Sequence, residues 1–102
     1  MYMKAIWNNT VIAEAPKEDL LRIEGNWYFP PQSIKREFYS DSDHTTTCHW
    51  KGLSNYYNVT VDSKKNDFGA WYYHTPMAGS IDRVGKDFTD YVAFWNGIEV
   101  TE

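Results

Sequence analysis

Cysteine, leucine and long uniform runs of residues are scarce in this sequence. Cys48 is the only cysteine, which excludes an internal disulfide and a cysteine-rich structural zinc site within one chain. No stretch approaches the roughly 20 apolar residues that a membrane helix needs, and the first residues lack the apolar core of a signal peptide. We therefore expect a cytoplasmic protein without a membrane partner.

Positive charge is also sparse. Ten basic residues stand against fourteen acidic ones, and the longest basic run is the pair Lys64 and Lys65. The sequence therefore lacks the basic surface that binds nucleic acid backbones, and we expect no nucleic acid partner. The histidines, Cys48 and the aspartates show no spacing typical of metal ligands. The sequence accordingly predicts neither a metal site nor a cofactor.

Aromatic residues take the place of the missing aliphatic ones. Leu, Ile, Val and Phe account for only 20 of 102 residues, whereas aromatic residues make up 18%. Val, Ile, Thr, Trp and Tyr favour strands, and a chain of this length suits one domain. We expect residues 1–102 to form a single all-β (mainly β) domain with an aromatic core and at most one or two short helical turns.

Turn-forming residues divide the chain into expected antiparallel hairpins. Strand pairs are predicted around Asn8-Asn9, around Gly25-Asn26 and around Asn96-Gly97. Asn-Gly is the strongest of these turn signals, because both residues tolerate the positive φ of a tight hairpin turn. Pro30-Pro31 ends the strand before it, since proline has no N–H for a sheet.

The middle of the chain predicts further strands. Residues 53–61 alternate as a half-buried strand, and another strand is expected over 70–73, after a polar turn over 62–67. Residues 34–36 predict one helical turn. Residues 40–47 contain no apolar side chain and are expected to form an exposed loop or a polar edge strand.

The densest group of chemically active side chains lies between Cys48 and Tyr57. A thiol, an imidazole, an amine and three aromatic rings fall within ten residues. A nearby Lys51 would favour the Cys48 thiolate and make it nucleophilic. The alternative is a small buried cysteine beside a core Trp50 and a solvated lysine.

Consecutive aromatic residues point to both faces of a sheet. In Trp27-Tyr28-Phe29, Tyr56-Tyr57 and Trp71-Tyr72-Tyr73, alternation sends neighbouring rings to opposite sides, so one core cannot hold them all. The surplus either lines a pocket for a planar or cationic ligand, with Lys51 or an aspartate as polar contact, or is covered on both faces.

A series of short motifs runs in order through nearly the whole chain. They are Trp7-Asn8-Asn9, Ile12-Ala13, Gly25-Asn26-Trp27-Tyr28-Phe29-Pro30, Cys48-His49-Trp50-Lys51-Gly52, Tyr56-Tyr57, Ala70-Trp71-Tyr72-Tyr73, Pro76 and Tyr91-Val92-Ala93-Phe94. Together they resemble the bacterial family catalogued as domain of unknown function 427 (DUF427). The Cys-x-Trp-Lys-Gly element is the most specific, and His49 stands where the family often has proline.

The resemblance implies a small β-tent-like domain, in which two sheets of antiparallel hairpins meet at an angle. Relatives of that architecture often hold a zinc knuckle of four cysteines, which aromatic packing would replace here. Family catalogues also attach a nucleotidyltransferase-like label. Asp41 and Asp43 resemble the paired carboxylates of such enzymes, but no Gly-Ser phosphate-binding turn precedes them, so the residues do not support that activity.

The resemblance also places the family's recurrent polar positions on this chain. They fall on Cys48, Lys51, Tyr56, Tyr57, Asp67 and Trp71. We expect a small-molecule binding module, with the rings stacking on the ligand and Lys51 contacting an anion. Its expected ligand site consists of Tyr28, Trp50, Lys51, Tyr56, Tyr57, Asp67 and Trp71. One alternative is an enzyme that uses Cys48 as nucleophile or redox thiol with Lys51 assisting. The other is a protein-interaction module that forms a homodimer.

Overall fold

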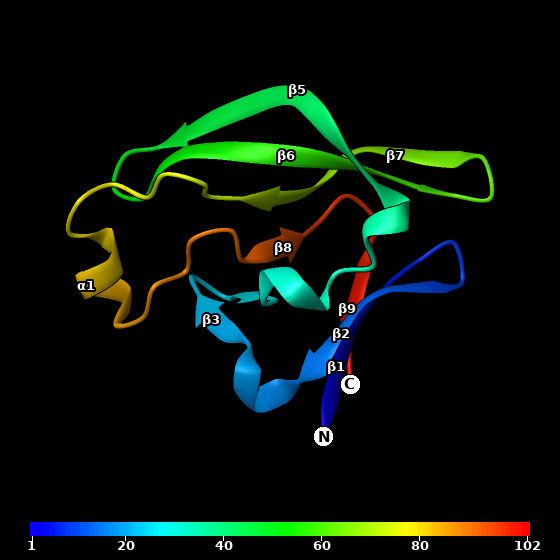
Figure 1. Cartoon of the computed structure of the whole chain (residues 1–102), viewed down its shortest axis with the longest axis horizontal. Helices are drawn as coiled ribbons and strands as arrows, with labels where there is room; N and C mark the ends of the chain where they lie inside the picture. The colour runs from blue at the N-terminus through cyan, green and yellow to red at the C-terminus, as the bar shows by residue number, and fades with distance from the viewer.

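The chain folds into three antiparallel sheets. A computed structural model describes residues 1–102. In Figure 1 a four-stranded sheet, in the order β5-β6-β7-β8, spans the upper half of the molecule. Its strands are β5 (Tyr39–Cys48), β6 (Gly52–Val61), β7 (Lys64–Tyr72) and β8 (Val92–Phe94). The mainly β, antiparallel architecture that the sequence predicts is thus confirmed, with three sheets where two were expected.

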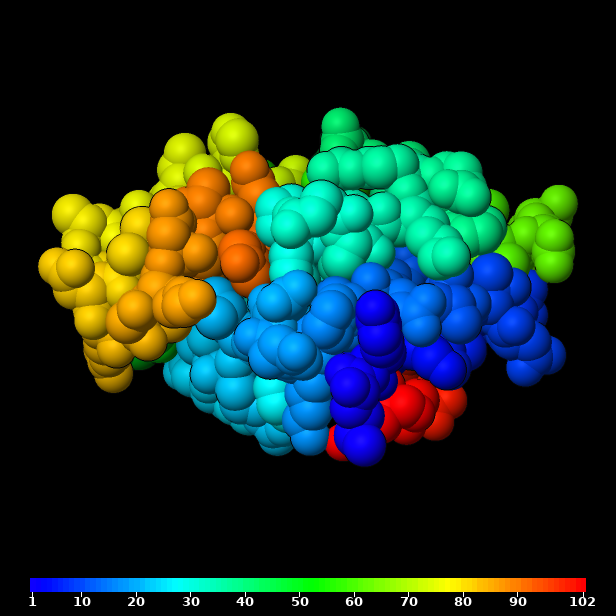
Figure 2. All heavy atoms as spheres, turned by 60° about the horizontal axis from the view of Figure 1, so that its bottom comes forward, coloured from blue at the N-terminus to red at the C-terminus, as the bar shows by residue number.

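The two smaller sheets lie below the large one in Figure 1. One has the order β2-β1-β9, and the other is the ribbon β3-β4. Their strands are β1 (Tyr2–Trp7), β2 (Thr10–Pro16), β9 (Glu99–Thr101), β3 (Leu21–Ile23) and β4 (Asn26–Tyr28). The pairing of β1 with β9 brings the two ends of the chain together, and Figure 2 shows them side by side on one face.

Helical structure is short and more dispersed than expected. The segments are η1 (Lys17–Asp19), η2 (Pro31–Ser33), η3 (Arg36–Phe38) and α1 (Ser80–Val84). The helical turn predicted over 34–36 is wrong, because Ile34 is buried in a β-bridge with Ala13 and the helical turns flank it. No helix of the chain is long and apolar enough to cross a membrane.

The first two hairpins form at asparagine and glycine turns. Asn8 and Asn9 adopt φ of 51° and 61°, as the turn between β1 and β2 requires. In the second hairpin the turn residues are Glu24 and Gly25, with φ of 52° and 82°, because Ile23 pairs with Asn26. The turn therefore lies one residue before the predicted position.

The Asn96-Gly97 signal gives a turn but no hairpin. Both residues have positive φ, yet β8 pairs with β7 while β9 pairs with β1. The predicted final hairpin is therefore wrong, because the turn carries the chain from the large sheet to the three-stranded one.

The polar segments of the middle of the chain join the large sheet. Residues 40–47 belong to the edge strand β5, the second of the two predicted alternatives. The turn predicted over 62–67 is confined to Asp62 and Ser63, since β7 begins at Lys64.

Two apolar clusters cover the two faces of the large sheet. The larger contains Phe29, whose ring meets Phe94 edge-on at 5.5 Å, and it includes the buried side chains of the three-stranded sheet. The smaller contains Tyr28, Tyr73 and Phe88. Alternation along the strands separates the two clusters, and a β-bridge between Phe29 and Val92 attaches the β3-β4 ribbon to the edge of the large sheet.

Candidate functional site

A cavity of about 290 Å³ opens on the face of the large sheet that carries the smaller apolar cluster. Five of its nine lining residues are aromatic. The lining consists of Asn26, Tyr28, Thr46, Lys51, Ser54, Tyr56, Trp71, Tyr73 and Trp95. Aromatic walls with a few polar groups are the usual composition of a small-molecule site.

Strand register brings the floor of the cavity together. Ser54 and Tyr56 are two residues apart on β6 and share one face. Ser54 pairs with Thr46 of β5, and Tyr56 pairs with Trp71 of β7. The Thr46 and Tyr56 hydroxyls are themselves hydrogen-bonded at 3.1 Å. Three neighbouring strands therefore contribute side chains to one surface.

Tyr28 crosses to this surface from the β3-β4 ribbon. Its ring is 1% exposed and meets the Trp71 ring edge-on, with centroids 6.1 Å apart. The Trp71 indole N–H donates a hydrogen bond of 3.1 Å to the Tyr28 hydroxyl. Burial raises the pKa of Tyr28 to about 12, so its hydroxyl stays protonated at neutral pH.

Lys51 supplies the charged group of the cavity lining. It lies in the turn between β5 and β6, and its carbonyl accepts a hydrogen bond of 2.9 Å from the Met77 N–H. Its side chain is 6% exposed, and its ammonium forms an ion pair with Glu24. The ammonium also lies 5.0 Å from the Trp50 ring centroid and 5.5 Å from that of Tyr73. One carboxylate and two aromatic faces thus offset the free-energy cost of burying the Lys51 ammonium.

Glu24 approaches Lys51 from the turn of the second hairpin. Its backbone has φ of 52°, in the left-handed region that a non-glycine residue seldom occupies. The hydrogen bond from Lys51 holds the pKa of the Glu24 carboxyl below its usual value, so Glu24 is charged at neutral pH. Its side chain is 53% exposed and lies outside the cavity lining.

Ser54 carries an unpartnered hydroxyl at the floor. The residue is 2% exposed, and its Oγ has no hydrogen-bond partner. Burial raises the pKa of the neighbouring Tyr73 to about 12. The nearby Ser54 hydroxyl lowers this pKa slightly, but its position relative to Tyr73 does not meet the geometry of a hydrogen bond. A buried hydroxyl without a partner costs about 1–3 kcal/mol, a cost that a ligand atom in the cavity can remove.

Aromatic side chains continue from the cavity onto the surface. His44 stacks on Phe68 with centroids 4.4 Å apart and meets the Tyr56 ring edge-on at 4.7 Å. The Trp95 indole N–H donates to the Phe68 carbonyl at 2.7 Å, and Trp95 is itself 46% exposed. Tyr56 and Trp95 belong to the cavity lining, so this row of rings forms its rim.

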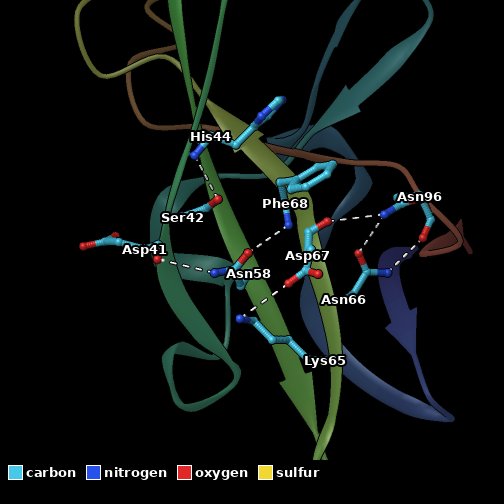
Figure 3. Close-up of polar contacts among 9 residues, drawn as sticks. All are labelled: Asp41, Ser42, His44, Asn58, Lys65, Asn66, Asp67, Phe68 and Asn96. Atoms are coloured by element: carbon cyan, nitrogen blue, oxygen red, sulfur yellow. Dashed lines mark hydrogen bonds and ion pairs between the residues drawn. The ribbon is translucent and has the colours of Figure 1, made fainter.

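Asparagine side chains hold the rim in place (Figure 3). Asn58 accepts a hydrogen bond of 2.9 Å from the Phe68 N–H, where the pairing of β6 and β7 shifts register. Phe68 has φ of 43° at this irregularity. On the other side of Phe68, Asn66 donates to the Asn96 carbonyl at 2.8 Å. These bonds tie the rim to β6 and to the turn after β8.

The structure brings together four of the residues predicted for the ligand site. Tyr28, Lys51, Tyr56 and Trp71 all line the cavity. Trp50 lies beside them on the other side of Lys51, where Arg83 covers its ring at 4.2 Å.

Tyr57 and Asp67 lie elsewhere. Tyr57 stacks on Tyr72 at 4.5 Å beside the larger cluster, on the opposite face of the sheet. Asp67 is exposed and lies 3.4 Å from the Lys65 ammonium.

Cys48 ends β5 and is half-buried against the smaller cluster. None of the side-chain hydrogen bonds or ion pairs involves its thiol, and Lys51 is engaged by Glu24 rather than by Cys48. No group of three or more His, Cys, Asp or Glu side chains converges in a way that could hold a metal ion.

Sequence reasoning missed five lining residues. Ser54 is two positions before Tyr56, and Tyr73 is two positions after Trp71, so period-two alternation was a signal for both. Asn26, Thr46 and Trp95 come from other strands and turns, and nothing local to them indicates a shared surface.

Comparison with known proteins identifies the family of the chain. No curated protein matches the chain. The family model described as "Domain of unknown function (DUF427)" matches residues 2–102. The match covers almost the whole chain and agrees with the motifs from Trp7 to Phe94. The chain therefore belongs to the DUF427 family.

Proposed function

We propose that this protein is a small-molecule binding module whose site is the cavity between β4 and the large sheet. The observation that carries the proposal is the Ser54 hydroxyl, which is buried at the cavity floor without a hydrogen-bond partner. Native proteins satisfy nearly all such groups. A ligand atom that hydrogen-bonds to Ser54 removes the free-energy cost of this unpartnered hydroxyl, and the gain adds to the binding affinity.

The walls favour a small, flat ligand. Tyr28, Tyr56, Trp71, Tyr73 and Trp95 surround a space of about 290 Å³, which is at the lower end of the range for ligand pockets. Tyr28 and Trp71 are fixed at right angles by their mutual hydrogen bond. Such preorganised rings reduce the entropy that binding must overcome.

A thermal-shift screen with nucleotides, aromatic acids and quaternary amines tests the proposal. A compound that binds the folded protein raises its melting temperature in a concentration-dependent way. Thr46→Trp places a large ring at an exposed lining position and should abolish the shift. Thr47→Trp is the matched control, because Thr47 is also exposed but points to the other face of β5.

The expected result is at least one stabilising compound whose effect is lost in Thr46→Trp and kept in Thr47→Trp. The proposal is overturned if no compound in the three classes stabilises the protein. It is also overturned if every stabilising compound acts equally on both variants, since binding then lies outside the cavity.

A further inference from the structure

The hydrogen-bonding groups of the cavity are mainly unused donors. An ammonium has three N–H donors and no acceptor, and the only hydrogen bond of Lys51 Nζ goes to Glu24. The Tyr28 hydroxyl accepts from Trp71, and no acceptor receives its own proton. The Ser54 hydroxyl is also free. Three residues, each more than nine-tenths buried, therefore offer protons to the same space.

The charge of the lining has one sign. Lys51 is the only ionised residue among the nine, and no aspartate or glutamate is among them. The nearest compensating charge, Glu24, is half exposed and lines a neighbouring groove beside Arg22, Trp50 and Arg83. A ligand in the cavity therefore meets an ammonium and hydroxyl donors but no carboxylate wall.

We propose that the cavity binds a planar carboxylate, an aromatic acid whose ring lies among the tyrosine and tryptophan walls and whose carboxylate accepts hydrogen bonds from Lys51 and Ser54. This inference rests on the proposed binding function and gives it a ligand class. A cation is disfavoured, because it would lie beside the Lys51 ammonium. A neutral amide keeps the ring contacts but loses the charge-assisted bond.

Glu24 has a defined part in this scheme. In the free protein its carboxylate engages the same ammonium from outside the cavity. A bound carboxylate shares Lys51 with Glu24, and the two negative charges repel each other. Glu24 therefore weakens the binding of an anionic ligand and is a positioning residue for Lys51.

Three probes of matched shape test the ligand class: benzoate, benzamide and benzyltrimethylammonium. Tryptophan fluorescence and amide NMR shifts report binding, since Trp71 and Trp95 line the cavity. We expect benzoate to bind about ten-fold more tightly than benzamide, and benzyltrimethylammonium to bind more weakly than both. Lys51→Met should weaken benzoate about ten-fold and benzamide less than about two-fold.

Further variants keep the test decisive if Lys51→Met does not fold. Ser54→Ala should weaken benzoate about five-fold. Glu24→Gln should strengthen benzoate about three-fold and leave benzamide unchanged, because only the anion feels the removed charge. Lys65→Met is the control, since Lys65 is an exposed lysine on β7 outside the lining and should leave benzoate affinity unchanged.

The outcomes separate this inference from the proposed function. Equal or tighter binding of benzamide or benzyltrimethylammonium overturns the carboxylate assignment but keeps the cavity as a binding site. Benzoate binding that is insensitive to both Lys51→Met and Ser54→Ala also overturns it. If none of the three probes binds and the thermal-shift screen yields no compound, the ligand class and the binding function both fail.

Discussion

The Trp71 indole N–H donates a 3.1 Å hydrogen bond to the Tyr28 hydroxyl, and this bond joins β7 to the β3-β4 ribbon at the wall of the cavity. Both rings belong to the wall, so their relative position sets its shape. The bond therefore holds the two rings of the cavity wall in position and also stabilises the smaller apolar cluster.

Tyr28→Phe tests this role of the bond. The change keeps the ring but leaves the Trp71 N–H without its acceptor, which should lower the free energy of unfolding by about 1–2 kcal/mol. Equilibrium urea denaturation measures the effect. Tyr2→Phe, at a tyrosine that is 55% exposed, should change the unfolding free energy by less than about 0.5 kcal/mol. Equal effects of the two substitutions would contradict a role for the buried bond.

The Lys51–Glu24 ion pair is asymmetric, because only the lysine is buried. Glu24→Gln leaves a buried ammonium with a weaker partner and should cost about 1–2 kcal/mol of unfolding free energy. Lys51→Met removes the buried charge altogether, fills similar volume and should cost less. The order of the two effects in urea denaturation is the test, and a larger loss for Lys51→Met would refute this view. Lys65→Met, at an exposed pair with Asp67, should be nearly neutral.

Asn58 holds the irregular pairing of β6 and β7 through the Phe68 N–H and bonds the Asp41 carbonyl of β5 at 3.5 Å. Asn58→Ala should therefore lower the unfolding free energy by about 1–2 kcal/mol and loosen the rim. Thr60→Ala, at an exposed position on the same strand, is the control. Amide hydrogen exchange of Phe68 gives a local readout, and unchanged protection in Asn58→Ala would argue against this anchor.

The burial of tyrosine side chains makes the free energy of unfolding fall at alkaline pH. It raises the pKa of Tyr28, Tyr72 and Tyr73 from 10.0 to about 12, and that of Tyr39 further still. Between pH 10 and about pH 12 the unfolded chain binds fewer protons than the native protein, so the free energy of unfolding falls as pH rises. The contribution is complete below pH 10 and is lost as pH passes through about 12.

Tyrosinate absorbance and circular dichroism, followed together against pH, measure this pH dependence. Ionisation of the four tyrosines with a raised pKa should coincide with the loss of structure. The double variant Tyr28→Phe/Tyr73→Phe should show a smaller slope of stability against pH in the same range. Full ionisation of all eight tyrosines near pH 10 in a protein that keeps its fold would contradict the assignment.

Local signals in the sequence predict local structure well here. The positive φ that Asn8 and Asn9 tolerate predicts the first hairpin. The polar segment 40–47 predicts an exposed loop or an edge strand, and the edge strand is what forms. Asn96 and Gly97 likewise form a turn, but the choice of partner strand is made by contacts far away in the chain. β9 pairs with β1, and Ile98 is buried in the larger cluster. The residues of a turn determine where the chain bends, but they do not determine which strand the following residues pair with.

The candidate site was only partly accessible from the sequence for the same reason. Alternation separates Tyr56 from Tyr57, but deciding which of the two lines the cavity requires knowing which face the three-stranded sheet covers. The partner of Lys51 is Glu24, 27 positions away on a strained turn. No spacing rule links these residues, whereas Ser54 could have been found from its position two residues before Tyr56.

An amide NMR titration of the isotope-labelled protein with benzoate, and in parallel with benzamide, tests the binding cavity most directly. We predict saturable shifts for at least one probe, concentrated at Tyr28, Lys51, Ser54 and Trp71 and at the indole N–H of Trp95. Thr46→Trp should suppress these shifts, whereas Thr47→Trp should not. The absence of saturable shifts with both probes, together with a thermal-shift screen that yields no compound, would contradict a ligand site in this cavity. Shifts centred on Tyr57 and Tyr72 on the opposite face would contradict it as well.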